Sequence, residues 1–134
     1  MSNACLCHIC VDEFHGLDWD KRYKIIKGIS CGLYYLHEEC HIVHLDLKPG
    51  NILLDETLVP KISDFGISKF VDEKQSHISM KGPLGTPCYM APEIMVHGEI
   101  SSSADMYSFG VILIEIIAGC KIIPTCHEKA GYRF

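Results

Sequence analysis

The stretch HLDLKPGN at residues 44–51 decides how the rest of this chain is interpreted. It places a carboxylate (Asp46), an ammonium group (Lys48) and a carboxamide (Asn51) within six residues, and a second carboxylate, Asp64, follows 18 residues after Asp46. Magnesium prefers oxygen ligands in near-octahedral geometry and is usually shared with substrate phosphates. The pattern therefore predicts a site for Mg²⁺ and phosphate.

The residues between the two carboxylates predict a short β-hairpin. One strand is expected at residues 52–55 (ILLD) and the other at residues 60–63 (PKIS). Because the strands of a hairpin run antiparallel, the second strand would bring Asp64 back beside Asn51.

Three motifs in order resemble the signature of the protein kinase family, H-R-D-L-x-x-x-N, then D-F-G, then A-P-E. In this chain they read HLDLKPGN, DFG at residues 64–66 and APE at residues 91–93. One such motif alone would carry little weight, but three in the right order at suitable distances are specific. The surrounding run YLHEECHIVHLDLKP is similar to plant receptor-like serine/threonine kinases.

The resemblance implies a chemistry and a role for each group of the site. Asp46 would accept or orient the proton of the substrate hydroxyl. Lys48 would neutralise charge on the transferring phosphoryl group of ATP, and a lysine here resembles serine/threonine kinases. Asn51 and Asp64 would hold Mg²⁺. The implied reaction is ATP-dependent phosphoryl transfer to serine or threonine hydroxyls of a protein substrate.

Other residues match supporting positions of the family. Thr86 would contact the catalytic aspartate and border the peptide-substrate pocket, although it could instead be a solvated loop hydroxyl. Glu93 is normally held by an arginine of a later helix, which these residues do not include. Asp105 would tie the start of its helix to the backbone of the catalytic loop, and it also fits a plain capping role. We expect structural roles for His44, Phe65 and Gly66, since Asp46 already serves as the base.

Leu45 departs from the family pattern, which has arginine there. That arginine commonly pairs with a phosphate on the activation segment and couples phosphorylation to activity. Leucine cannot form this pair, so switching should depend less on phosphorylation of the expected activation segment, residues 67–90. Single alanine replacements of Ser76, Ser79 and Thr86 in a longer chain would test this, and dependence on Ser76 or Ser79 would contradict it.

Composition narrows the class of protein. The chain has 134 residues, which suggests one domain or part of one, and 48% hydrophobic residues are enough for a core. The net charge is −5 with no basic cluster, so nucleic-acid binding and attraction to anionic membranes have no support. No apolar run approaches the ~20 residues that span a bilayer. Five of the eight cysteines are scattered through periodic or motif segments and no secretory signal precedes them, which favours a reduced, cytoplasmic setting. The resembled family is membrane-anchored with an intracellular kinase domain.

Residues 1–16 are the least interpretable part. Four soft ligands occur within six residues, and His15 could join them, which raises a zinc hypothesis; the four are Cys5, Cys7, His8 and Cys10. Structural zinc sites usually pair two ligand clusters, and no second cluster is evident. An unstructured N-terminal segment is the other interpretation.

Two helices are expected. The first begins at residues 17–20, capped by Asp18 or Asp20, and ends near Glu39 or Cys40. Its predicted buried face is Tyr23, Ile26, Ile29, Leu33 and Leu36. Gly28 and Gly32 are costly inside a helix, which indicates close approach of another element. The second helix, at residues 109–118, is apolar nearly all round, a pattern typical of a buried helix. Because the later covering helices of the resembled family are absent from these residues, we expect it to keep an exposed flank that favours aggregation or capture by a partner.

The expected fold class is α+β and protein-kinase-like, truncated to a mainly helical large lobe with a small β-hairpin region and no small lobe. We expect residues 17–120 to be a partial protein kinase domain, with residues 1–16 and 121–134 unassigned. The chain contains no G-x-G-x-x-G loop and no lysine of a V-A-I-K strand. Two hypotheses follow: a serine/threonine kinase whose activity needs more than these residues, or a catalytically silent fragment that binds other kinase or receptor chains.

Overall fold

The computed structural model describes residues 4–9, 16–71, 78–79 and 85–122 of the chain. Its two long helices are α2 (Trp19–Tyr34) and α4 (Ser102–Ala118). A π-helical turn, η3 (Tyr35–Glu39), continues α2 to the end predicted for the first helix.

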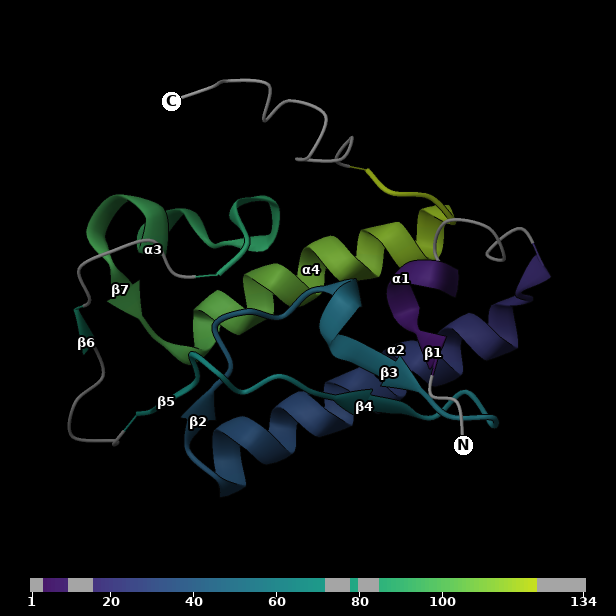
Figure 1. The fold of residues 1–134 in the computed structure, drawn as a ribbon, viewed down its shortest axis with the longest axis horizontal. Helices are drawn as coiled ribbons and strands as arrows, with labels where there is room; N and C mark the ends of the chain where they lie inside the picture. Colours follow the sequence, from purple (N-terminus) through teal and green to yellow (C-terminus); the bar gives the residue numbers. More distant parts are fainter. Residues whose placement is uncertain (1–3, 10–15, 72–77, 80–84, 123–134) are drawn as a thin grey trace.

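The other elements are short. In chain order they are β1 (Ala4–Cys5), α1 (Leu6–His8), β2 (Ile42–Val43), η4 (Pro49–Asn51), β3 (Ile52–Leu54), β4 (Pro60–Ile62), β5 (Lys69–Phe70), β6 (Ile78–Ser79), η5 (Pro87–Tyr89), α3 (Pro92–His97) and β7 (Glu99–Ile100). Figure 1 shows α4 crossing the middle of the molecule, with α3 and β7 near its beginning and α1 near its end. The described residues thus form a helix-rich structure with a few short strands, in agreement with the α+β class.

The predicted hairpin is present. Strands β3 and β4 pair antiparallel with Ile52 opposite Ile62, and β1 adds on the other side of β3. The ladder continues one step beyond the strands, where the Ser63 backbone N–H donates to the Asn51 carbonyl at 2.8 Å. Asp64 is therefore the next residue after the partner of Asn51, as the antiparallel geometry predicts.

Helix α2 confirms Asp18 as its N-cap but corrects the predicted buried face. The Asp18 carboxylate accepts a hydrogen bond from the Lys21 backbone N–H at 3.0 Å. The buried positions are Ile25, Ile29, Leu33 and Leu36, whereas Tyr23 is 54% exposed and Ile26 is only partly buried. The observed steps of four, four and three residues follow the α-helical period of ~3.6 residues more closely than the predicted steps do. Tyrosine can remain at the solvent-exposed surface because its ring is apolar and its hydroxyl is polar.

The two helical glycines of α2 lie against β4, as expected from their cost in a helix. A Cβ on Gly28 would lie 2.5 Å from two ring carbons of Pro60, and a Cβ on Gly32 would lie 3.1 Å from Ile62 Cδ1. Contacts that short do not fit a side chain. The glycines therefore let the hairpin lie directly on the helix.

Two hydrophobic clusters form the core. The first joins α2, the hairpin, the N-terminal residues and α4; it consists of Leu6, Ile9, Ile25, Ile29, Leu33, Leu47, Ile52, Leu54, Phe109, Ile112 and Ile116. The second lies where the loop after β2 meets α3, β7 and the start of α4; it consists of Val43, Leu45, Ala91, Ile94, Ile100 and Ala104. The loop that carries HLDLKPGN contributes to both clusters, so packing fixes it on two sides.

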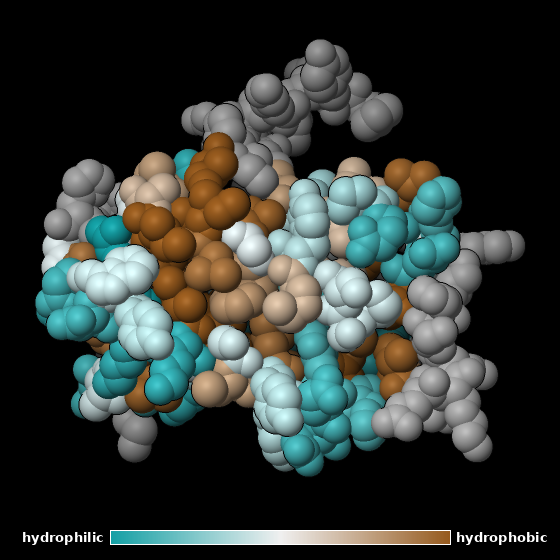
Figure 2. All heavy atoms as spheres, turned by 180° about the vertical axis from the view of Figure 1, so that it is seen from behind, coloured by the Kyte–Doolittle hydropathy of each residue, from teal (hydrophilic) through white to brown (hydrophobic). Residues whose placement is uncertain are grey.

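Helix α4 is present, and the described structure buries one face of it and leaves the expected flank exposed. One face is buried, including Phe109, Ile112 and Ile116, while Ile114 and Ile117 are 55% and 51% exposed. Figure 2 shows a broad hydrophobic area on the rear face of the molecule. An apolar sequence thus identified the helix but not how much of it the described residues cover.

The N-terminal residues 4–9 are ordered against the core, so the prediction of an unstructured segment is wrong there. Leu6 is fully buried, and β1 pairs with β3. A disulfide joins Cys5 and Cys7, which corrects the expectation of uniformly reduced cysteines and removes two thiols from the zinc hypothesis. Cys10 and His15 lie outside the described residues. Within the described ranges, no helix is both long and apolar enough to cross a membrane.

Candidate active site

A carboxylate of α4 holds the backbone of the loop that carries HLDLKPGN. Asp105 is buried; its Oδ2 accepts a hydrogen bond from the His44 N–H at 2.7 Å, and its Oδ1 accepts one from the Leu45 N–H at 2.9 Å. His37 Nε2 lies 2.9 Å from Oδ2. The helix N-cap is Ser101, so the contact expected between Asp105 and the loop is present and the capping alternative is not.

His44 is a fully buried ring with both nitrogens in hydrogen bonds. Its Nδ1 accepts from the Asp46 backbone N–H at 3.2 Å, and its Nε2 lies 2.8 Å from the Ser63 carbonyl. An accepting Nδ1 and a carbonyl opposite Nε2 assign the tautomer with the proton on Nε2. The edge of Phe65 packs against the ring at a centroid distance of 5.0 Å. His44 has no nitrogen left for a substrate, in keeping with a structural role.

The side chains of Asp46, Lys48 and Thr86 form a compact triangle. The Thr86 hydroxyl donates to Asp46 Oδ1 at 2.9 Å. The Lys48 ammonium lies 3.0 Å from Thr86 Oγ1 and 3.3 Å from Asp46 Oδ2. Asp46 and Lys48 are 17% and 32% exposed, so the pair is partly shielded from water but open to a ligand. Thr86 thus makes the predicted contact with the aspartate.

Asn51 fixes the loop from the inside. Its Nδ2 donates to the Asp46 carbonyl at 2.8 Å and lies 3.3 Å from Asp46 Oδ2. The backbone carbonyl of Asn51 accepts a hydrogen bond from the Ser63 hydroxyl at 3.0 Å. These bonds orient the carboxamide so that Nδ2 faces Asp46 and Oδ1 remains an acceptor.

Asp64 is exposed at the end of the hairpin, in a left-handed backbone conformation with φ 62°. Its Oδ1 accepts the Gly66 N–H at 3.3 Å. No hydrogen bond or ion pair joins the Asp64 side chain to Asn51 or Lys48 in the described part of the chain. The structure therefore brings Asp64 near the loop by backbone pairing but leaves its carboxylate free to accept a ligand.

Gly85 packs directly onto the loop. Its φ is +83°, and a Cβ there would lie 2.6 Å from the Leu45 carbonyl oxygen and 3.7 Å from Asp46 Oδ1. A left-handed conformation and a backbone contact of that kind both require glycine. This close approach places Thr86, the next residue, against Asp46.

Helix α4 also anchors the segment that follows Thr86. Ser108 Oγ donates to the Tyr89 carbonyl, and the Tyr89 hydroxyl lies 3.2 and 3.0 Å from the two carboxylate oxygens of Glu115. Burial raises the pKa of Glu115, and the hydrogen bond from Tyr89 partly offsets that rise. One helix therefore holds both sides of the triangle, the loop through Asp105 and the Thr86 segment through Tyr89.

Leu45 does not face the site. Its side chain is buried in the second cluster, and its φ is +71°. A long cationic side chain would be costly in this apolar setting unless paired. The residue therefore joins the loop to the core instead of presenting a cation.

Other predicted positions are less informative. Glu93 is half-buried in the first turn of α3, and within the described ranges it has no ion-pair partner. Ser76 lies outside the described residues, and Ser79 is placed only as backbone paired with Glu99. Most of residues 72–84, which belong to the predicted activation segment, likewise lie outside the residues that the structure describes.

Sequence reasoning missed four side chains that position the site: His37, Ser63, Tyr89 and Glu115. Ser63 follows directly from the hairpin register, so counting pairs from Ile52 would have found it. The other three act on residues 19 to 68 positions away, and no local pattern relates such positions.

The donor set suits a magnesium–phosphate complex better than a fully protein-bound metal. The described residues hold no group of three or more His, Cys, Asp or Glu side chains placed to share a metal ion. Asn51 Oδ1 and the exposed Asp64 carboxylate offer two oxygen ligands. Magnesium typically takes one or two protein oxygens and completes its shell with phosphate and water. The residues present fit that arrangement.

One family model and several proteins of known class match this chain. The family model described as the protein kinase domain matches residues 3–133. A cysteine-rich receptor-like protein kinase 27 of Arabidopsis thaliana is 52% identical over 105 residues, 77% of this chain. A probable LRR receptor-like serine/threonine-protein kinase of the same plant is 50% identical over 105 residues, also 77% of the chain.

A third similar protein is a G-type lectin S-receptor-like serine/threonine-protein kinase of A. thaliana, 48% identical over 108 residues or 79% of the chain. The match spans 16%, 10% and 13% of the lengths of these three relatives. The similarity therefore concerns a short part of much longer proteins.

Proposed function

The chain belongs to the protein kinase family, and from that premise we propose that residues 17–120 are part of a domain that transfers the terminal phosphoryl group of ATP to serine or threonine hydroxyls of a protein. In this reaction the substrate oxygen forms the new bond to phosphorus, the bond from phosphorus to the ADP oxygen breaks, and the hydroxyl proton leaves toward a base. The receptor-like serine/threonine kinases that resemble the chain support this chemistry.

The triangle of Asp46, Lys48 and Thr86 is the observation that carries the proposal. The Thr86 hydroxyl, an aliphatic hydroxyl, donates to Asp46 Oδ1 at 2.9 Å, and the Lys48 ammonium lies 3.0 Å from the hydroxyl oxygen, Thr86 Oγ1. A substrate hydroxyl needs the same two neighbours: an acceptor for its proton and a cation near the phosphoryl group it attacks. Asp46 is the proposed base, and Lys48 is the proposed contact to the phosphoryl oxygens.

Asn51 and Asp64 are the residues that would hold Mg²⁺. The ion would neutralise charge on the phosphates of ATP. Asn51 contributes a fixed carboxamide, since its Nδ2 is already held by the Asp46 carbonyl at 2.8 Å. Asp64 contributes an exposed carboxylate whose place is set by the hairpin.

We further propose that these 134 residues alone are catalytically silent, because the chain carries no glycine-rich loop and no V-A-I-K lysine. Phosphoryl transfer depends on positioning and electrostatic stabilisation, so loss of half the phosphate contacts should lower the rate at least ~10³-fold. Since Leu45 is a core residue, we also expect weak coupling between phosphorylation of Ser76 or Ser79 and activity.

A chimera tests the site. Residues 17–120 would replace the matching segment of the 52% identical relative, and transfer from Mg²⁺-ATP to a serine/threonine peptide would be measured. We expect transfer in the chimera and its loss in Asp46→Asn and Asp64→Asn. An inactive chimera, with the parent relative active in the same assay, would contradict the proposed function.

The second candidate is a non-catalytic binding role toward other kinase or receptor chains. It is favoured by the exposed apolar side chains of α4, Ile114 and Ile117, since such surfaces on soluble proteins often mark contact sites. Transfer of phosphate by the isolated 134 residues that Asp46→Asn abolishes would exclude this role and would also contradict the proposed silence of the isolated chain. The chimera distinguishes the two candidates, because a purely non-catalytic segment would give no transfer there.

A further inference from the structure

The disulfide between Cys5 and Cys7 lies against the turn that leads into Asn51. Strand β1, which ends at Cys5, pairs with β3, which begins directly after Asn51. Cys5 Sγ lies 3.3 Å from the Pro49 carbonyl oxygen and 3.6 Å from the Gly50 carbonyl oxygen. One sulfur of the disulfide therefore contacts the two residues that directly precede a proposed Mg²⁺ ligand.

The hydrogen bonds open to this sulfur depend on its oxidation state. A disulfide sulfur carries no proton and can only accept a hydrogen bond, whereas a thiol can also donate one. In the disulfide, Cys5 Sγ accepts from the Cys7 backbone N–H at 3.2 Å and has no proton for the neighbouring carbonyl oxygens. The thiol of a reduced Cys5 has such a proton, and the Pro49 oxygen at 3.3 Å is within its reach. Reduction would thus add a hydrogen bond from the N-terminal segment to η4.

The turn that would receive this hydrogen bond is otherwise closed by short-range contacts. The Asn51 N–H donates to the Lys48 carbonyl at 3.0 Å, and the Ile52 N–H donates to the Pro49 carbonyl. A donor from Cys5 would hold the same turn from outside, and opening the turn would break all three bonds. The added bond should therefore favour the closed turn and the position of Asn51.

The N-terminal segment has an anchor that does not depend on the disulfide. Leu6, between the two cysteines, is fully buried in the first cluster. Burial of a leucine side chain stabilises its docked position by itself. We therefore expect Cys5 to stay beside η4 after the disulfide is opened.

We propose that the Cys5–Cys7 disulfide is a redox-sensitive site: its reduction by a dithiol lets Cys5 donate to the Pro49 carbonyl and stabilises the turn that carries Asn51. The consequence for Mg²⁺ binding rests on the proposed function, whereas the reduction and the hydrogen bond do not.

The reaction is a thiol–disulfide exchange. A thiolate of the dithiol attacks one sulfur of the protein to form a mixed disulfide, and its second thiolate then displaces that sulfur. The bond between Cys5 and Cys7 breaks, a sulfur–sulfur bond forms within the reagent, and two electrons and two protons pass to the two cysteines. Both cysteines are only half-buried, so a thiolate can reach the bond.

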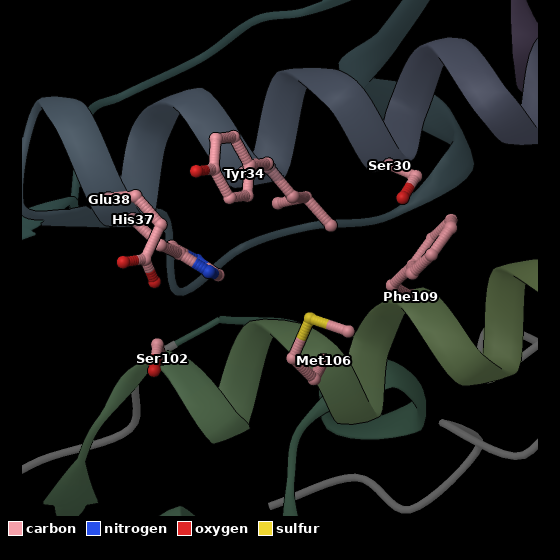
Figure 3. A pocket seen from close by; sticks show the side chains of 8 residues that line it. Ser30, Tyr34, His37, Glu38, Ser102, Met106 and Phe109 are labelled. Carbon is pink, nitrogen blue, oxygen red and sulfur yellow. The ribbon is translucent and has the colours of Figure 1, made fainter.

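A reference for global opening is found at a different place in the fold. A cavity of about 290 Å³ between α2 and α4 is lined by neither cysteine of the disulfide and by no residue of η4. Figure 3 shows His37 and Glu38 on the upper helix, with Met106 and Phe109 of α4 opposite. The amide of Leu33, a buried residue of α2 that lines this cavity, reports opening of the core.

Reduction of the folded 134-residue chain is the first test. Dithiothreitol followed by iodoacetamide should alkylate Cys5 and Cys7, located by mass spectrometry, while the Leu33 amide remains protected from hydrogen exchange. Alkylation of the two cysteines only under conditions in which Leu33 also exchanges would overturn the proposal, because the disulfide would then open only with the fold.

Two matched variants separate the added donor from the lost cross-link. Cys7→Ser has no Cys5–Cys7 disulfide but keeps the Cys5 thiol, whereas Cys5→Ala has neither. The parent and both variants carry Cys10→Ser, so that this nearby thiol cannot form a new disulfide. They are compared without reductant, because Cys88 is disulfide-bonded as well.

Amide exchange of Asn51 and Ile52, each relative to Leu33, gives the measurement. In Cys7→Ser both amides should exchange about two- to fivefold more slowly than in Cys5→Ala and in the disulfide-bonded parent, a modest effect because a thiol is a weak donor. Equal exchange in the two variants would show that Cys5 donates nothing to the turn. Exchange in Cys7→Ser as fast as in the parent, or faster, would show that reduction does not stabilise the turn. Either result would overturn the proposal.

The proposed function is tested separately by the chimera. Absence of phosphoryl transfer there, with amide exchange as expected, would contradict the proposed function and leave the redox-sensitive site standing.

Discussion

At the scale of single residues, the site is built from polar side chains that are held by defined hydrogen-bond and ion-pair partners. Asp46 meets Thr86, Lys48 and Asn51, and Asp105 meets the backbone of His44. Every buried side-chain nitrogen or oxygen in the described residues has a hydrogen-bond partner. Such saturation keeps groups in place before any ligand arrives, which is the arrangement that catalysis by positioning requires.

Thr86 should matter through its hydroxyl and not through its shape. Thr86→Val in the chimera removes the donor to Asp46 and the acceptor for Lys48. Loss of a hydrogen bond to a charged group costs about 1.5–3 kcal/mol, and each ~1.4 kcal/mol is a factor of ten, so transfer should fall about ten- to a hundredfold. Thr86→Ser, which keeps the hydroxyl, should retain most of the rate. Equal rates in Thr86→Val and the parent would refute this role.

Glu115 should make stability pH-dependent. Burial raises its pKa in the folded state, so the folded chain binds this proton more tightly than the unfolded chain does. The protonated Glu115 carboxyl therefore stabilises the folded chain below the ordinary pKa of 4.5, and this stabilisation is lost as the pH rises through the higher pKa of the folded state. Glu115→Gln lacks this titration. Between pH 4.5 and neutrality, the free energy of unfolding of Glu115→Gln, measured in urea, should therefore increase relative to that of the parent chain. A difference between the two free energies that does not change with pH would contradict the prediction.

At the scale of elements, glycine at helical positions of α2 is a packing requirement. A Cβ on Gly28 would lie 2.5 Å from the Pro60 ring, whereas a Cβ on Gly110 of α4 would meet nothing within 4 Å. The two residues therefore share a helical backbone and differ in surroundings. They form a matched pair for measuring what close approach between α2 and the hairpin requires.

Gly28→Ala should lower the free energy of unfolding by about 1–3 kcal/mol, the usual cost of overpacking. Gly110→Ala should raise it by roughly 0.5–1 kcal/mol, because alanine loses less backbone entropy in a helix. Urea denaturation of both variants provides the measurement. Stabilisation by Gly28→Ala would show that the hairpin does not rest on the helix as described.

The helical period explains one success and one error. Asp18 caps α2 as its side-chain chemistry indicates, since a carboxylate can accept from the free N–H of Lys21. The predicted buried face was right at its last three positions and wrong at its first two, where Tyr23 and Ile26 were assigned in place of Ile25. Tyrosine and isoleucine are both apolar enough to satisfy the pattern, and only the neighbouring hairpin decides which of them faces inward.

At the scale of the whole molecule, α4 is the common support. It contributes Phe109, Ile112 and Ile116 to the first cluster. It also holds the loop that carries HLDLKPGN through Asp105, and the Thr86 segment through the contact of Glu115 with Tyr89. Its opposite face carries exposed apolar side chains, among them Ile114 and Ile117. The helix therefore supports the candidate site on one face and carries exposed apolar side chains on the other.

The exposed face of α4 should drive association of the isolated chain. Replacing Ile114 and Ile117 by lysine should lower concentration-dependent association, measured by sedimentation velocity, at least severalfold. The free energy of unfolding should change little, because both side chains are already exposed to solvent. Val59→Lys removes an exposed apolar residue of the hairpin loop and serves as the matched control. If all three replacements act alike, association is not specific to α4.

Much of this structure could be predicted from local patterns. The hairpin, the cap of α2, the close approach at Gly28 and the contact of Thr86 with Asp46 agree with expectation. Each follows from strand pairing, side-chain chemistry or a motif whose parts lie in known order. The order of residues 4–9 could not be predicted, because Leu6 is buried only by elements far along the chain.

The sequence by itself determined the family, the order of the motifs and the kinds of chemical group at the site: a carboxylate at Asp46, an ammonium at Lys48 and an oxygen pair at Asn51 and Asp64. These depend on side-chain type and on short spacings between residues, both of which can be read directly from the sequence. Tertiary structure alone decided that Leu45 faces the core, which side chains of α4 are exposed, and that His37 contacts Asp105, the residue that holds the loop. Such features depend on residues 60 or more positions apart meeting in space, and no local period encodes that meeting.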